Sequence, residues 1–211
     1  QTPGPLIPLR SPSQRFLLRL AAAFTYRDFR ILWLGAITSA TGTWMQKVAQ
    51  SWLVLTLTGS PLLLGLDAFL GELPILLFTL LGGVIADRHD RRYVLIGSQF
   101  VQMASALTLA ALVLSDTWAD GELNGDVLEI WHILSLSFLS GCGQAFGGPA
   151  YQSLIPSLVP KDNLPNAIAL NSIQFNLARV IGPLLAGVTL AALGTAACFI
   201  INGLSFFVVI V

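Results

Sequence analysis

The stretch LLLGLDAFLGELPILLFTLLGGVIADRHDRRYVLIG, residues 62–97, decides the fold class. Its first part, residues 62–86, is almost entirely apolar and carries Asp67 and Glu72 as its only charged side chains. At about 1.5 Å per residue it is long enough to cross the roughly 30 Å core of a bilayer as a helix. Charged residues then fill positions 87–92, and a new apolar run starts at Tyr93. The stretch therefore predicts two membrane-spanning helices joined by a short charged loop.

The same alternation continues on both sides of this stretch. The predicted spans are residues 29–58, 62–86, 93–114, 130–159, 164–193 and 196–211. Gly59-Ser60-Pro61 separates the first two spans, as a tight turn should. The last run is shorter than a bilayer core requires, so we expect a truncated sixth helix. Residues 1–28 are expected to be a cytoplasmic N-terminal tail, and residues 29–211 a transmembrane bundle.

The composition excludes several classes of protein. Charged residues make up 10% of the chain, against about 25% in soluble domains, and mean hydropathy is +0.75. The 11 basic and 11 acidic residues balance, which argues against a basic nucleic-acid-binding face. Cys142 and Cys198 lie in apolar runs and predict neither a disulfide framework nor a metal site. We find no catalytic constellation and no nucleotide-binding motif, so we expect neither an enzyme nor a cofactor.

Basic residues in the connecting segments predict the orientation. The tail before the first span carries several arginines, and Arg88, Arg91 and Arg92 lie between the second and third spans. The connection between the third and fourth spans has no Lys or Arg and is acidic. Because basic residues accumulate on the cytoplasmic side, the N-terminus and the 87–92 loop are expected there. The predicted location is the inner (cytoplasmic) membrane, with several passes.

The 82–92 loop resembles the signature between helices two and three of the major facilitator superfamily. Five positions match the superfamily pattern of a glycine, an acid and three basic residues: Gly83, Asp87, Arg88, Arg91 and Arg92. Asp90 stands where the pattern usually has a second glycine.

Two further stretches support the resemblance. Residues 176–187 are similar to the Gly-Pro motif of the superfamily's antiporters, with Gly182, Pro183 and Gly187 in place. Residues 149–156 and 164–172 resemble the branch that contains enterobactin-exporter-type proteins. Lysophospholipid transporters share part of that second pattern.

The resemblance implies an all-α integral membrane fold, the N-terminal six-helix bundle built from a 3+3 inverted repeat. Its partner would be a C-terminal six-helix half of the same chain, and the protein would be a monomer. Asp87 would pair with the N-terminus of a helix in that half, and Gly83 would let the two bundles approach. The three arginines would join a charge network that breaks when the cytoplasmic side opens.

Three ionisable residues lie deep in the predicted spans, where they are costly and therefore informative: Lys47, Glu72 and Arg179. Lys47 and Glu72 each lie about 12 residues, or about 18 Å, from the turn after the first span, so they could pair. Glu72 could exchange a proton, with Lys47 or Arg179 tuning it or contacting an anionic substrate. A structural ion pair is the other interpretation. Asp67, closer to the turn, is expected at the membrane interface.

Neutral polar residues complete the candidate site. Gln46, Gln50 and Gln144 could line a cavity or bridge helices. Gly141 takes the place of an arginine that many proton-coupled exporters of the superfamily carry. The leading hypothesis is a secondary active transporter, an antiporter that exports a siderophore, drug or similar amphiphile against protons. The alternatives are a lysophospholipid flippase-like carrier and a non-transporting membrane scaffold or sensor.

Overall fold

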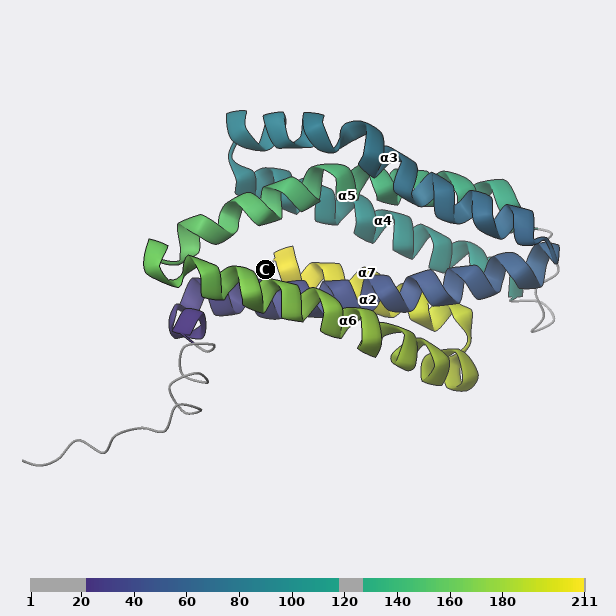
Figure 1. The fold of residues 1–211 in the computed structure, drawn as a ribbon. Coiled ribbons are helices and arrows are strands. Elements are labelled where there is room, and N and C mark those ends of the chain that lie inside the picture. The colour runs from purple at the N-terminus through teal and green to yellow at the C-terminus, as the bar shows by residue number, and fades with distance from the viewer. Residues whose placement is uncertain (1–21, 118–126, 211) are drawn as a thin grey trace, which may run out of the picture.

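The structure, a computed structural model, describes residues 22–117 and 127–210 (Figure 1). Most of the expected N-terminal tail and part of the acidic connection lie outside these residues. The described residues form helices and no strand. In chain order these are η1 (Ala22–Thr25), α2 (Arg27–Thr58), α3 (Pro61–Arg88), α4 (Arg91–Thr117), α5 (Ile130–Leu158), η2 (Lys161–Asn163), α6 (Leu164–Leu193) and α7 (Thr195–Ile210). The all-α fold class with six long helices, predicted from the sequence, is confirmed.

Local chemistry explains where the helices end. Gly59 closes α2 in the left-handed region, with φ 59°, and its N–H donates to Leu55 O at 2.9 Å. Ser60 then caps α3 by accepting from Leu63 N, with Pro61 at the first helical position. Asp90 caps α4, since its Oδ1 accepts from Arg92 N at 2.9 Å. The acid that replaces the usual glycine of the loop therefore starts the next helix.

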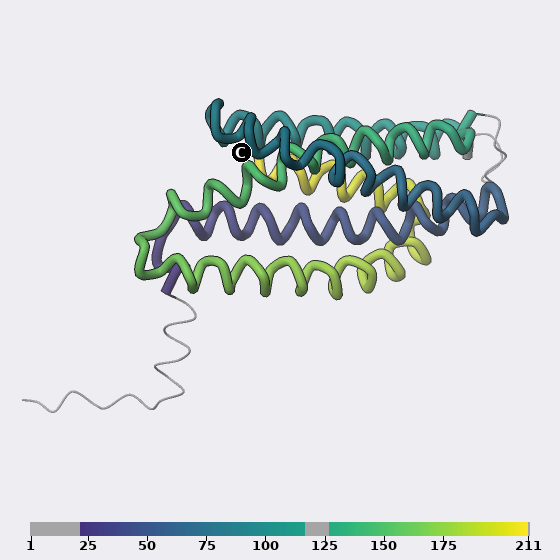
Figure 2. The backbone as a smooth tube through the Cα atoms, turned by 45° about the horizontal axis from the view of Figure 1, so that its top comes forward, coloured from purple at the N-terminus to yellow at the C-terminus, as the bar shows by residue number. Residues whose placement is uncertain are grey.

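The six long helices form two groups of three. Helices α3, α4 and α5 lie on one side of the bundle and α2, α6 and α7 on the other (Figures 1 and 2). Within the groups, α5 packs on α3 and α4, and α2 packs on α6 and α7. Helix α4 packs on α7 and joins the groups. If α2, α3 and α4 are exchanged with α5, α6 and α7 respectively, the same pairs of helices are in contact. Helices α2 and α5 run in opposite directions, as in an inverted repeat.

Glycines lie where α3 crosses α5. A Cβ on Gly82 of α3 would collide with Ala145 O, and a Cβ on Gly141 of α5 would collide with Gly71 O. Small residues therefore let the α3 and α5 backbones touch at two levels. This contact turns one face of α3, including Asp67 and Pro74, into the bundle.

The outer surface of the bundle is apolar. On α3, Leu62, Leu76 and Leu80 are each about 80% exposed. Helices α3, α4 and α6 are long and apolar enough to cross a membrane, and α7 is a shorter apolar helix. Helices α2 and α5 are of similar length, and glutamines and serines on both of them line the inside of the bundle. Apolar side chains thus face outward while polar ones gather inside, the reverse of a water-soluble domain.

Candidate functional site

A polar cavity of about 720 Å³ lies between the two groups of helices. All six long helices contribute to its wall. Its amide side chains are Gln46, Gln50, Gln99, Gln102, Gln144, Gln152, Asn171, Gln174, Asn176 and Asn202. Apolar clusters lie toward both ends of the bundle, one around Phe29 and Ile155 and the other around Leu53 and Phe199. Most of the polar side chains of the cavity lie between these two clusters.

Lys47 and Glu72 form an ion pair across this cavity. Lys47 Nζ donates to Glu72 Oε1 at 2.7 Å, and the two side chains are 51% and 61% exposed. Both residues line the cavity. The pairing that equal depth in neighbouring helices predicted is present, and it joins α2 to α3. Since both groups remain accessible, the pair is open to water or a ligand.

Trp44 lies between two cations. Lys47 Nζ is 5.1 Å from its ring centroid and Arg179 Cζ is 5.3 Å from it. Phe175 meets the same ring edge-on, with centroids 6.2 Å apart. A cation over an aromatic face gains electrostatic stabilisation from the ring. The structure thus brings two of the three deep ionisable groups together through an aromatic residue that the sequence did not single out.

Asp67 lies inside the bundle, and its expected depth near the membrane interface stays a prediction. Its carboxyl is 7% exposed and borders the cavity. Gln50 Nε2 donates to Oδ1 at 2.8 Å and to Oδ2 at 2.9 Å, and Ser137 Oγ donates to Oδ1 in a short hydrogen bond. Counting residues from the turn gives the position of Asp67 along α3 but could not show which face of the helix it occupies. The glycine contact with α5 fixes that face.

A chain of hydrogen bonds extends from Asp67 to α7. Gln46 Nε2 reaches Gln50 Oε1 at 3.4 Å, and Asn202 Nδ2 donates to Gln46 Oε1 at 2.6 Å. Ser205 Oγ in turn donates to Asn202 Oδ1 at 3.2 Å. Gln46 and Gln50 therefore do both things considered for them, because they line the cavity and bridge helices. The spacing of Gln46 and Gln50, one helical turn, was the available signal.

Two other residues of the cavity wall, Gln144 and Gln99, have fewer hydrogen-bond partners than Gln46 and Gln50. Gln144 is exposed to the cavity. Gln99 is 7% exposed. Among the described residues, its Oε1 is the one buried side-chain nitrogen or oxygen atom that lacks a hydrogen-bond partner. A buried acceptor of this kind costs free energy until water or a ligand donates to it. It lies on the cavity wall, so a cavity occupant could satisfy it.

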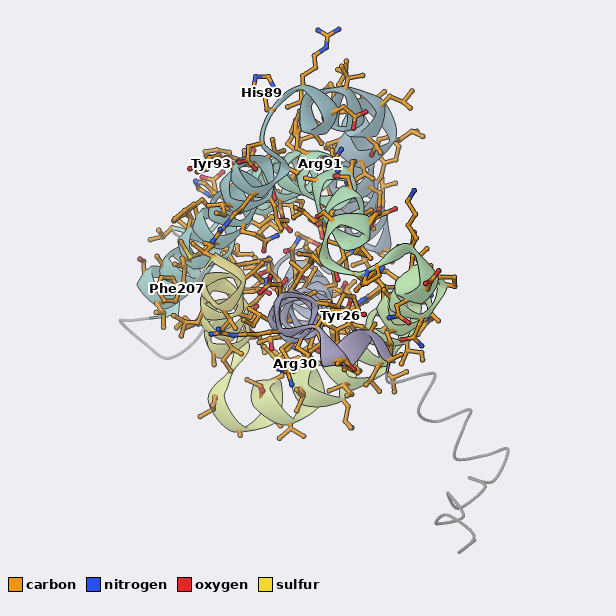
Figure 3. The ribbon with its side chains drawn as sticks, turned by 90° about the vertical axis from the view of Figure 1, so that its left-hand side faces the viewer. Tyr26, Arg30, His89, Arg91, Tyr93 and Phe207 are labelled. Carbon is orange, nitrogen blue, oxygen red and sulfur yellow. The ribbon has the colours of Figure 1, made fainter. Side chains whose placement is uncertain are left out.

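The charged loop lies at the end of the bundle where α3 ends and α4 begins (Figure 3). Arg91 Nη1 donates to Ser153 O at 2.8 Å, which ties α4 to α5. Arg91 Nη2 also lies 3.9 Å from Asp87 Oδ1, whose side chain is 74% exposed. Arg88 and Arg92 are exposed. The loop therefore ties one half-buried arginine to α5 and presents the acid and two other arginines at the surface.

The predicted motif glycines differ in their surroundings. A Cβ on Gly83 or Gly187 would meet nothing within 4 Å, whereas one on Gly182 would meet Trp44 and Thr41 of α2. Pro183 lies within α6 without ending it. Gly182 thus serves the packing of α6 on α2. The contacts of the described residues do not require glycine at Gly83 or Gly187.

Helices with an apolar outer surface, arranged as two inverted groups around a polar cavity, define one half of a secondary transporter. The family model described as "Transmembrane secretion effector" matches residues 20–211. The chain therefore belongs to this family of the major facilitator superfamily, a transporter family, and is a multi-pass membrane protein.

Relatives agree with this assignment. The chain is 27% identical over 160 residues to macrolide efflux protein A of Streptococcus pyogenes, covering 75% of this chain and 36% of that protein. It is 27% identical over 169 residues to the staphyloferrin A transporter of Staphylococcus aureus, covering 80% and 40%. It is 27% identical over 183 residues to the enterobactin exporter of Citrobacter koseri, covering 87% and 42%. The predicted resemblance to enterobactin-exporter-like proteins is confirmed. No solved structure matches the chain.

Proposed function

We propose that the protein is a proton-coupled exporter of an amphiphilic small molecule such as a siderophore or drug. The observation that carries the proposal is the cavity of about 720 Å³ with charged and amide side chains at mid-bundle. Such a cavity can hold a drug-sized compound. The relatives are named for export of a macrolide, of staphyloferrin A and of enterobactin. The chain spans between 36% and 42% of their length, so a second set of helices would complete the cavity.

The charged loop would act as a cytoplasmic gate. Among the described residues Asp87 has one ion pair, at 3.9 Å with Arg91, and its side chain is 74% exposed, which suits a carboxylate that pairs with the N-terminus of a helix in a second bundle. Gly83, with open space around it, suits close approach of that bundle. In this proposal the N-terminus faces the cytoplasm of the inner membrane, and the working unit is a monomer.

The deep charges would contact substrate or tune coupling. Lys47 and Arg179 share Trp44, and Glu72 is the single carboxylate that pairs with either of them among the described residues. An amphiphile with an anionic group could place its ring against Trp44 and its charge near the cations.

The test uses the protein in the full length that its gene encodes, in liposomes with an imposed proton gradient. Movement of ethidium, of a macrolide and of a catecholate siderophore is followed, with a protonophore and protein-free liposomes as controls. Gradient-driven movement of at least one compound, abolished by the protonophore, is the expected result. Folded protein that moves none of the three would overturn the proposal and direct attention to lysophospholipids.

A further inference from the structure

We propose that the carboxyl group of Asp67, together with Ser137 and Gln50, is the proton-binding site of this transporter. The inference rests on the proposed proton coupling and assigns it to a residue other than Glu72. Asp67 lies on α3, Ser137 on α5 and Gln50 on α2, so the site spans both groups of helices. All three residues border the cavity, through which water can deliver and remove the proton.

Asp67 and Glu72 differ in what balances their charge. Glu72 has the Lys47 ammonium at 2.7 Å, and its side chain is 61% exposed. Asp67 is 7% exposed, and among the described residues no cation forms an ion pair with it. Its donors are a neutral amide and a neutral hydroxyl. A buried carboxylate without a cation gains more from accepting a proton than one held in an ion pair does.

The charged and titratable groups on the surrounding helices make their contacts with residues other than Asp67. On α2, Lys47 pairs with Glu72, and on α6, Arg179 lies over Trp44. On α5, His132 accepts from the backbone N–H of Glu129 at the end of the helix. On α4, Asp116 accepts from the N–H groups of residues 127 and 128 at the same end of the bundle. Helix α7 carries no Asp, Glu, Lys, Arg or His.

The partners of Asp67 can hold either form of the carboxyl. When it is ionised, both Ser137 Oγ and Gln50 Nε2 donate to it. When a proton from cavity water occupies Oδ1, the Ser137 hydroxyl can turn and accept from it, because a hydroxyl both donates and accepts. The Gln50 amide goes on donating to Oδ2. The Ser137 O–H is then free to donate to cavity water, because Ser137 borders the cavity.

The hydrogen-bond chain connects this site to the other group of helices. When the charge on Asp67 is lost, the charge-assisted hydrogen bond from Gln50 becomes a neutral one of about half the strength. Gln50 also contacts Gln46, which holds Asn202 of α7. Protonation therefore weakens a polar bridge between the α3–α4–α5 group and the α2–α6–α7 group. This is the step by which a bound proton would favour rearrangement of the bundle.

The test is a pH titration of the full-length protein in liposomes, followed by infrared difference spectroscopy without substrate. We expect a carbonyl band of a protonated carboxylic acid that disappears as pH rises. It should be absent in Asp67→Asn, which keeps the shape of the side chain, and present in the matched control Glu72→Gln. Ser137→Ala should shift the band, because it removes a hydrogen bond. A band that survives Asp67→Asn, or that disappears in Glu72→Gln, would overturn the assignment.

Transport assays separate this inference from the proposed function. Asp67→Asn should reduce proton-driven accumulation of ethidium at least tenfold and leave exchange of ethidium down its own gradient. Proton-driven accumulation at the wild-type rate in Asp67→Asn would refute the site while leaving the exporter intact. Accumulation driven by a sodium gradient without a pH gradient would also refute it. A wild-type protein that moves nothing but shows the Asp67 band would instead refute the proposed function.

Discussion

The substitution Gly182→Ala tests the packing of α6 on α2 that holds Trp44 beside the cavity. A Cβ at Gly182 would lie 2.5 Å from Trp44 Cβ, 2.8 Å from Thr41 O and 3.1 Å from Met45 N. Ordinary contact begins at 3.4 Å, so Trp44 Cβ would have to retreat by 0.9 Å from its 2.5 Å position. Two of the three obstacles are backbone atoms, which cannot rotate away. Overpacking of this kind costs about 1–3 kcal/mol.

Gly187→Ala is the matched control, because the same substitution on the same helix would meet nothing within 4 Å. Both variants gain similar helix propensity, about 1 kcal/mol, so the difference between them reports the contact. At about 2–4 °C per kcal/mol, Gly182→Ala should melt about 2–12 °C below Gly187→Ala. A thiol-reactive dye can follow unfolding in detergent, since Cys198 is fully buried. Equal melting temperatures, or a higher one for Gly182→Ala, would refute the packing argument.

Three further predictions concern charged and aromatic residues. Arg91→Gln should lower the free energy of unfolding by about 1–3 kcal/mol, because it removes a charge-assisted hydrogen bond to α5. The control Arg88→Gln, at an exposed site, should leave the melting temperature unchanged. Glu72→Gln should change stability by less than about 1 kcal/mol, since the ion pair is exposed, and a larger loss in thermal melts would contradict this. Trp44→Leu should raise the transport KM several-fold and Trp44→Phe much less, because Phe keeps an aromatic face for both cations.

The sequence could predict the helices because the signals for them are local. Apolar length, the Gly59-Ser60-Pro61 turn and the charged loop each act through neighbouring residues, and the helices begin and end near the expected positions. The pairing of Lys47 with Glu72 also followed from depth, since the two residues lie at about the same distance along the chain from the turn that joins α2 to α3. Whether the predicted spans cross a membrane with those bounds stays a prediction.

The sequence could not predict which face of a helix turns inward. Asp67 and Asn202 belong to the cavity because α3 packs on α5 and α7 on α2, and these contacts join residues far apart in the chain. The contact of Trp44 with Arg179, which lies on a helix far along the chain, is of the same kind. Depth can be counted from a turn. Orientation depends on packing between helices, which only the assembled bundle shows.

The central claim, that the polar cavity is an aqueous path for the transported compound, can be tested by cysteine accessibility. In a cysteine-free background of the full-length protein, Gln144→Cys places a thiol on the cavity wall and Leu80→Cys places one on the apolar outer surface. A membrane-impermeant thiol reagent should label position 144 and not position 80, and a transported compound should protect position 144. Labelling of position 80 alone, or labelling of position 144 that a transported compound leaves unchanged, would contradict the account.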